Sequence, residues 1–150
     1  MQITKHAAVS VAAGLGLYAL THSLIIAFFS LIAGIFLDLD HIIDYWREHP
    51  FKLDLAHFFA TCEEYKLNKA YLFLHSAELL LPLAFFTYFT KSSAGLGFTA
   101  GFLIHMICDQ LANRVYPCTY SFIYRWTKGF SNQNVFCINQ ELFENGKPEK

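Results

Sequence analysis

Four apolar runs, separated by short polar breaks, dominate the pattern along this chain. They cover residues 7–20, 24–37, 71–89 and 94–112. The runs are too long for β-strands, and their composition, apart from the glycines, favours α-helices. The pattern therefore predicts an all-α protein built on about four apolar helices.

The length of each run bears on whether it crosses a membrane. A membrane-spanning helix needs about 20 apolar residues, whereas a run of about 10–14 equally suits a buried core helix. The third and fourth runs are long enough to span, and the first two are short. In the fourth run, Gly97 and Gly101 form a small-xxx-small pair, which lets a second helix approach closely. We predict an integral membrane helical bundle; the alternative is a soluble, very apolar bundle.

The segment between the second and third runs, residues 42–70, has mixed polarity. His49-Pro50 predicts a break, because the residue before a proline is disfavoured in a helix. After it, Phe51, Leu55, Phe58 and Phe59 recur at helical spacing. This piece is therefore predicted to be one amphipathic helix, which either lies on the membrane surface or packs on the bundle.

Composition supports one very apolar domain. A chain of 150 residues fits a single domain, covering 1–150, with a polar, frayed tail from about residue 145. Hydrophobic residues make up 55% and charged residues 15%. The hydrophobic fraction is above the average for soluble proteins and the charged fraction is below it, which indicates a chain in contact with lipid. The net charge of −1 implies no polyanion partner, so nucleic-acid binding is not expected.

The positive charges lie mostly on one side of the predicted membrane. If all four runs span and the N-terminus is cytoplasmic, ten Lys and Arg residues fall on the inner side and only Lys91 falls outside. The ten are Lys5, Arg47, Lys52, Lys66, Lys69, Arg114, Arg125, Lys128, Lys147 and Lys150. This excess follows the positive-inside rule, although it is partly trivial because the outer loops are very short. We therefore predict a multi-pass protein of the cell inner membrane.

The second run ends in a concentrated group of ionisable residues, Asp38-Leu39-Asp40-His41. Asp38 and His41 are three apart, so they share a face if the helix continues. Carboxylate oxygens and imidazole nitrogens are ligands for a divalent metal such as zinc. The alternative for this stretch alone is a helix end with solvated acids.

Three other parts of the chain offer similar groups. His6 precedes the first run, His75 and Glu78 lie near the start of the third, and His105 and Asp109 lie near the end of the fourth. On helices, the i,i+3 and i,i+4 spacings put each pair on one face. In the four-span topology all of these groups fall at one depth, near the cytoplasmic face. Ionisable groups inside spans are expensive and usually face one another or water.

These groups predict a metal site with hydrolytic chemistry. It would hold one divalent ion, best matched by zinc, or two ions about 3.5–4 Å apart. Glu78 or Asp40 is expected to take a proton from the activated water as the catalytic base. The predicted metal ligands are His6, Asp38, Asp40, His41, His75, His105 and Asp109.

Each group also has a less specific interpretation. His105 alone would more often be a hydrogen-bonded core histidine, and His6 a solvated terminal residue. The same ligands would also serve a non-catalytic metal-binding protein or a metal-ion carrier, or a scaffold whose polar cluster fastens helices. A carrier needs polar groups at several depths, whereas the sequence places them at one level, which favours the hydrolase.

The order of these motifs resembles the YdjM-like family of membrane-bound, predicted metal-dependent hydrolases. The matching pieces are Lys5-His6-Ala7, Asp38-Leu39-Asp40-His41, His75-Ser76 and the His105-to-Asp109 pair, which together extend over most of the chain. Two positions depart from the family pattern: Leu37 stands where a proline is frequent, and Ala70 stands at the first histidine of a longer box. The resemblance implies a membrane-bound hydrolase, which we expect to act on a phosphoester, with a lipid as one candidate substrate.

Overall fold

The computed structural model describes residues 3–50, 54–64, 66–113 and 115–137, with side chains from residue 7 onward except that of Glu63. Within these ranges all regular elements are helical, and β-structure is limited to isolated bridges. The all-α prediction is therefore confirmed. The elements are α1 (Ile3–Thr21), α2 (Leu24–Glu48), α3 (Leu55–Glu63), the 3-10 helix η1 (Ala77–Leu79), α4 (Leu80–Thr90), α5 (Ser93–Ala112), α6 (Phe122–Thr127) and α7 (Asn132–Val135).

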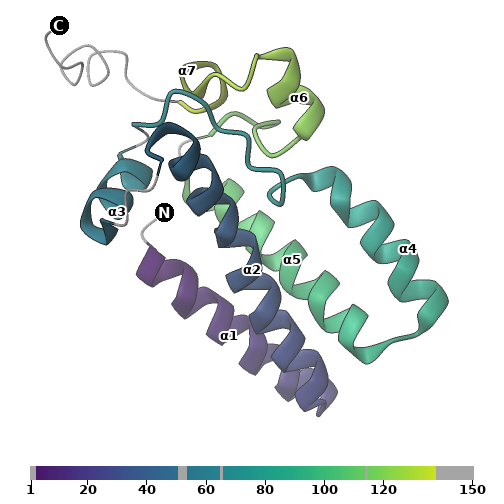
Figure 1. The fold of residues 1–150 in the computed structure, drawn as a ribbon. Helices are drawn as coiled ribbons and strands as arrows, with labels where there is room; N and C mark the ends of the chain where they lie inside the picture. Colours follow the sequence, from purple (N-terminus) through teal and green to yellow (C-terminus); the bar gives the residue numbers. More distant parts are fainter. Residues whose placement is uncertain (1–2, 51–53, 65, 114, 138–150) are drawn as a thin grey trace, which may run out of the picture.

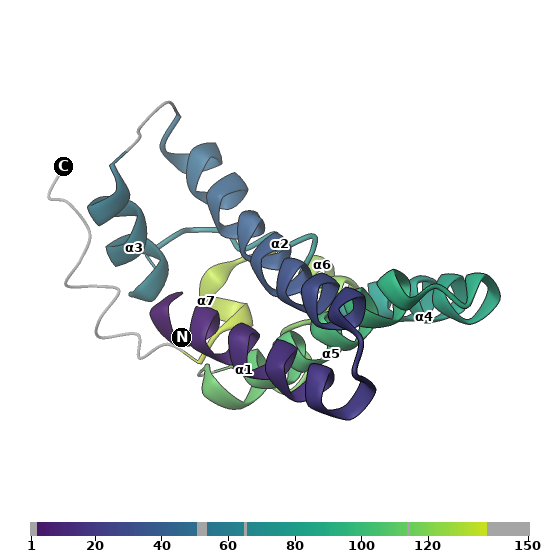
Figure 2. The same cartoon turned by 90° about the horizontal axis from the view of Figure 1, so that it is seen from below.

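The four longer apolar helices lie side by side, and the short helices gather at one end (Figure 1). Helices α1, α2 and α5 pack against one another, whereas α4 packs mainly on α5 and projects to one side (Figure 2). At the end where α6 and α7 lie, a buried core of Leu37, Phe102, Met106 and Tyr120 joins α2 and α5 to the C-terminal segment. The candidate metal site forms at this same end.

Short turns join the helices into two hairpins. Between α1 and α2, His22 adopts a left-handed conformation with φ of 52°, and Ser23 caps α2 by accepting the N–H of Ile26. Between α4 and α5, Lys91 has φ of 48°, and Ser92 caps α5. Serine is a favoured N-cap, so both polar breaks end one helix and begin the next.

The predicted close helix contact at Gly97 and Gly101 is confirmed, and α2 is the partner helix. A Cβ on Gly97 would lie 2.8 Å from Cα of Ile26, and one on Gly101 would lie 2.7 Å from Cα of Ser30. Only glycine permits the backbones to approach so closely. Because both contact pairs advance by four residues in the same direction, α2 and α5 run parallel with a fixed register.

We expect Gly101→Ala to lower the free energy of unfolding by about 1–3 kcal/mol, because the new methyl meets the backbone of Ser30, which cannot rotate away. Gly16→Ala in α1 is the matched control. No atom lies within 4 Å of the Cβ it adds, so it should stabilise α1 by up to about 1 kcal/mol. Thermal unfolding in detergent measures both changes, and a loss of equal size in the two variants would contradict this account of the contact.

The structure corrects the prediction for the third apolar run. Residues 71–76 are not helical, and the α-helix begins only at Leu80. His75 and Glu78 therefore do not share the face of one helix. The second run, by contrast, continues through Asp38 to Glu48, so α2 is longer than its apolar part suggested. Helix α3 occupies the predicted amphipathic piece, and the polar tail lies outside the described residues.

Two helices of the described chain, α2 and α5, are long and apolar enough to cross a bilayer. The shorter α4 does not reach that length, contrary to the prediction for its run. Core helices of soluble proteins have similar composition, so the length of these two helices is limited support for a membrane location.

Candidate metal centre

The register of α2 and α5 brings their ionisable residues together. One turn beyond the Ser30–Gly101 contact, a Cβ on Gly34 would lie 3.8 Å from Nδ1 of His105. A further turn adds Asp38 on α2 and Asp109 on α5, because both helices advance four residues per step. Close packing at glycines thus fixes which acid meets which histidine.

Three acids on one face of α2 hold the segment of residues 68–76, which lies beside them without helical structure. Asp40, Asp44 and Glu48 follow one another at i,i+4 spacing, and we call them the acidic ladder. Each accepts two backbone N–H groups, with N···O distances of 2.8–3.1 Å for five of the six. The donors, in the order of the acids, are Leu74 and His75, Tyr71 and Leu72, and Asn68 and Lys69.

Arg125 of α6 holds the same segment through its carbonyl groups. Its side chain is fully buried, and each of its five N–H groups has a partner at 2.8–3.1 Å. The acceptors are the carbonyl oxygens of Tyr71, Leu72, His75 and Thr119 and the hydroxyl of Ser76. Negative charge thus faces the N–H side of the 68–76 segment, and positive charge faces its C=O side.

The imidazole of His75 is oriented by the first acid of the ladder. Asp40 Oδ2 lies 3.3 Å from Nδ1 of His75, so the opposite nitrogen, Nε2, points into the cluster. A carboxylate that contacts the outer nitrogen of a ligand histidine is the usual arrangement around protein-bound metals, because it fixes the ring and its tautomer. The contacts of Asp40 therefore give it a positioning role.

Four side chains converge at the centre of the cluster. Nε2 of His75 lies 3.3 Å from Nε2 of His105, and each of these nitrogens lies 3.4 Å from Oδ2 of Asp109. Asp38 Oδ1 lies 3.6 Å from Nε2 of His105. Ligand atoms about 2.0–2.2 Å from a tetrahedral ion are separated by roughly 3.3–3.6 Å, so these spacings match the separation of metal ligands.

The residues present fit a metal ion. Asp38, His75 and His105 each offer one ligand atom, and the three atoms lie within 4.8 Å of one another. Both histidines are buried, whereas the side chain of Asp38 is 27% exposed and lies at the rim. This Asp38/His75/His105 group is the part of the described chain that could hold a divalent ion.

The electrostatics of the cluster also favour a cation. Burial alone would lower the pKa of His75, but its hydrogen bonds with Asp109 and Asp40 raise it to about 9. The carboxylates therefore stabilise positive charge on His75 at neutral pH. A metal ion would bind in competition with that proton.

His41 and Asn113 lie at the edge of the cluster. The ring of His41 is next to that of His75, with centroids 5.2 Å apart. Asn113, one turn after Asp109, donates to Oδ1 of that acid and to the hydroxyl of Tyr120. His6 lies in α1 one turn before Ser10, which packs against Gly34, but its side chain is outside the described residues. The ligand roles of His41 and His6 stay predictions.

Glu78 makes a different set of contacts. Its carboxylate accepts the hydroxyl of Ser121 at 2.6 Å and the N–H groups of Phe122 and Ile123 at 2.9 and 3.2 Å. These groups form the N-terminus of α6, where unpaired N–H donors and the helix dipole favour a negative charge. The contacts of Glu78 are those of a helix cap, and they give no support to its predicted role as catalytic base.

We expect Glu78→Gln to lower the free energy of unfolding by about 1 kcal/mol at neutral pH through loss of this cap. Burial raises the pKa of Glu78, but the hydrogen bonds from Ser121 and from backbone N–H groups lower it to about 2, below its ordinary value of 4.5. Because the folded pKa is the lower one, the stabilisation is present above pH 4.5 and is lost as the pH falls toward 2. The difference in unfolding free energy between wild type and Glu78→Gln should therefore shrink over this window, and a difference independent of pH would contradict the assignment.

Asp44, Glu48 and Arg125 were not among the predicted site residues. Asp44 and Glu48 extend the spacing of Asp40 by four and eight residues, so the i,i+4 repeat was a usable signal for one acidic face. Arg125 stands in an aromatic segment, and nothing in its local sequence indicates that it is buried.

In comparisons with known proteins, no family model, no curated protein and no solved structure matches this chain.

Proposed function

We propose that this protein is a membrane-bound, metal-dependent hydrolase that cleaves a phosphoester. The observation that carries the proposal is the convergence of Asp38, His75 and His105, with Asp109, on one point near the polar end of an apolar bundle. The choice of hydrolysis rests on the resemblance of the motifs to the YdjM-like family.

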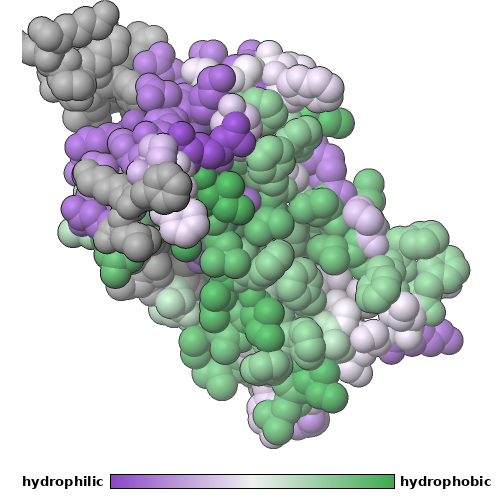
Figure 3. Space-filling model, in the orientation of Figure 1, coloured by the Kyte–Doolittle hydropathy of each residue, from purple (hydrophilic) through white to green (hydrophobic). Residues whose placement is uncertain are grey.

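A membrane location is supported by the surface of the helices. Large apolar side chains are exposed along all four longer helices, including Leu15, Phe28, Phe85 and Ile107. The visible face is hydrophobic along α1 and α2 and hydrophilic at the end that carries the short helices (Figure 3). A bilayer would cover the first region, and the second would lie in water. The asymmetry of Lys and Arg in the sequence favours a cytoplasmic location for that polar end.

Zinc is the ion that we propose for the site. Two imidazoles and one carboxylate match its preferred ligands, and His75, His105 and Asp109 would hold it, because a catalytic zinc keeps one position for water. Zinc in such a site supplies Lewis-acid activation of water and of a phosphoryl group.

The chain's own residues would then position the reaction. Asp40 holds the ring of His75, Asn113 holds Asp109, and Asp38 at the rim faces the solvent from which water and substrate arrive. In the hydrolysis, the oxygen of water forms a bond to phosphorus, the P–O ester bond breaks, and the leaving alkoxide takes up a proton. Asp38 is the best placed of the three acids to accept the proton that the water loses.

The alternative function, a metal-ion carrier, is disfavoured by the packing beneath the site. A carrier requires a polar route through the bundle, but below His105 the seam between α2 and α5 is closed by backbone contacts at Gly97 and Gly101. The cluster has access to solvent at the rim near Asp38, as a hydrolase requires.

Turnover of bis(4-nitrophenyl) phosphate by protein purified in detergent tests the proposal. We expect hydrolysis that stops with chelator and returns when zinc is added. Asp38→Asn should abolish it, and His22→Asn, which changes an exposed residue in the α1–α2 turn, should not. Turnover that is insensitive to chelator, or none with zinc bound, would refute the hydrolase assignment.

A further inference from the structure

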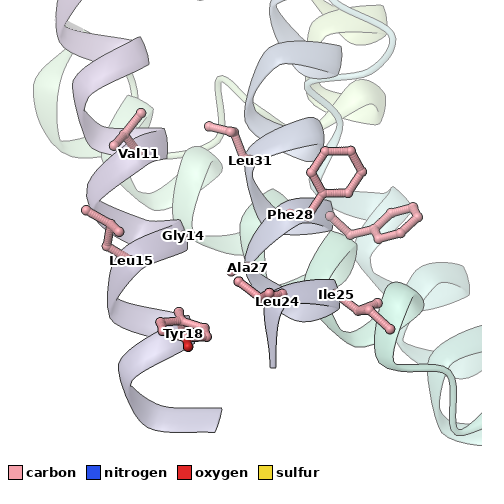
Figure 4. A pocket seen from close by; sticks show the side chains of 10 residues that line it. Val11, Gly14, Leu15, Tyr18, Leu24, Ile25, Ala27, Phe28 and Leu31 are labelled. Carbon is pink, nitrogen blue, oxygen red and sulfur yellow. The ribbon is translucent and has the colours of Figure 1, made fainter. Parts of the chain in front are cut away.

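An apolar groove lies between α1 and α2 at their hairpin end, away from the metal centre. Its volume is about 700 Å³. The residues that line it include Val11, Leu15 and Tyr18 of α1 and Leu24, Phe28 and Leu31 of α2 (Figure 4). Apart from the hydroxyl of Tyr18, these side chains offer no polar group, so the groove suits a hydrocarbon chain better than a polar ligand.

The groove and the metal centre share one face of α2. Leu24, Leu31 and Asp38 are spaced by seven residues, which is close to two helical turns, so they lie on one strip along the helix. Asp38 is the rim residue of the site. The strip therefore leads from the groove directly to the exposed edge of the metal centre.

On α2 between groove and site, Ile35 is exposed, and on α1 the small residues Ala7 and Ala8 are exposed, while the buried Ser10 packs against Gly34. At 1.5 Å per residue, Leu31 lies about 10 Å and Leu24 about 21 Å from Asp38 along the helix axis. Half the hydrocarbon core of a bilayer is about 15 Å thick. A chain whose head group is at Asp38 would thus reach well into the groove.

We infer that the groove holds the alkyl chain of a membrane lipid phosphoester whose phosphate lies at the metal centre. This inference rests on the proposed function and names its substrate class. The lipid would keep its normal orientation in the inner leaflet, with its phosphate at the cytoplasmic level and its chain directed toward the bilayer centre. Substrate would then enter from the membrane by sliding along the strip between α1 and α2.

Two substrates that differ only in the chain test the inference: hexadecyl 4-nitrophenyl phosphate and methyl 4-nitrophenyl phosphate. Leu15→Trp places a bulky ring in the groove, and we expect it to lower the ratio of kcat/KM, hexadecyl over methyl, at least tenfold. Leu81→Trp, on the exposed surface of α4, is the matched control and should leave the ratio at its wild-type value. Val11→Phe is a second groove variant in case Leu15→Trp does not fold.

Retention of hexadecyl phosphate, counted by native mass spectrometry, gives a readout that needs no turnover. Wild type and Leu81→Trp should retain it, and the groove variants should lose it. An equal effect of Leu15→Trp and Leu81→Trp on the ratio and on retention would overturn the groove assignment while leaving the hydrolase intact. Turnover of neither substrate would overturn the hydrolase, and retention lost only in the groove variants would still support the lipid site.

Discussion

Replacing Arg125 by methionine is expected to lower the free energy of unfolding by about 3–5 kcal/mol, the range for removing one partner from a buried charged network. Methionine fills similar space but leaves the acceptors of five hydrogen bonds unsatisfied in the interior. The loss is a large part of the stability of a typical domain. Thermal unfolding in detergent should show a midpoint lower by at least about 6 °C.

Two further variants make this result specific. Lys128→Met removes one positive charge from an exposed site on the same side of the molecule, and its effect should stay within about 0.5 kcal/mol. Arg125→Lys keeps the charge but has three donors in place of five, so it should fall between wild type and Arg125→Met. A loss in Arg125→Met no larger than that in Lys128→Met would show that the buried guanidinium does not hold the 68–76 segment.

Loss of His105 is expected to weaken zinc binding at least about 100-fold, or about 2.7 kcal/mol. His105 contacts every other member of the central group: His75, Asp109 and Asp38. Asparagine in its place keeps a polar side chain but removes the imidazole nitrogen. Elemental analysis of purified His105→Asn should show less than a stoichiometric amount of zinc, and titration against a competing chelator gives the affinity.

His22→Asn is the matched control for zinc binding, because it makes the same substitution at a histidine in the α1–α2 turn. Asparagine tolerates the positive φ at this position, so the fold should be unaffected. We expect wild-type zinc content in this variant. If both variants bind zinc as the wild type does, the ion is held elsewhere and the Asp38/His75/His105 group only fastens helices together.

Much of the α2–α5 half of the site was predictable from sequence. Residues on a helix recur at fixed intervals, so the spacing of His105 and Asp109 places them on one face wherever the helix packs. The glycines at positions 97 and 101 indicated where a second helix approaches. The identity of that helix, and therefore the register that joins Asp38 to His105, depends on tertiary packing, which no local pattern specifies.

The position of His75 was not predictable in the same way. The residues after Ala70 favour a helix locally, but their N–H groups are bound by acids 27–35 residues earlier. Long-range hydrogen bonds from side chains thus override the local preference. The contacts of Glu78 were not predictable for the same reason, since its partners lie more than 40 residues later in the chain.

The attachment of residues 68–76 through main-chain atoms has a consequence for how this protein can change during evolution. Apart from the hydroxyl of Ser76 and the side-chain amide of Asn68, the acidic ladder and Arg125 bind peptide groups, which every residue type except proline provides in full. Side chains on the outer side of the segment, such as the exposed Phe73, are free to diverge without disturbing the attachment. Natural variants should therefore tolerate wide variation at such positions and exclude proline where an N–H is bound, while the position of the His75 ring is inherited unchanged.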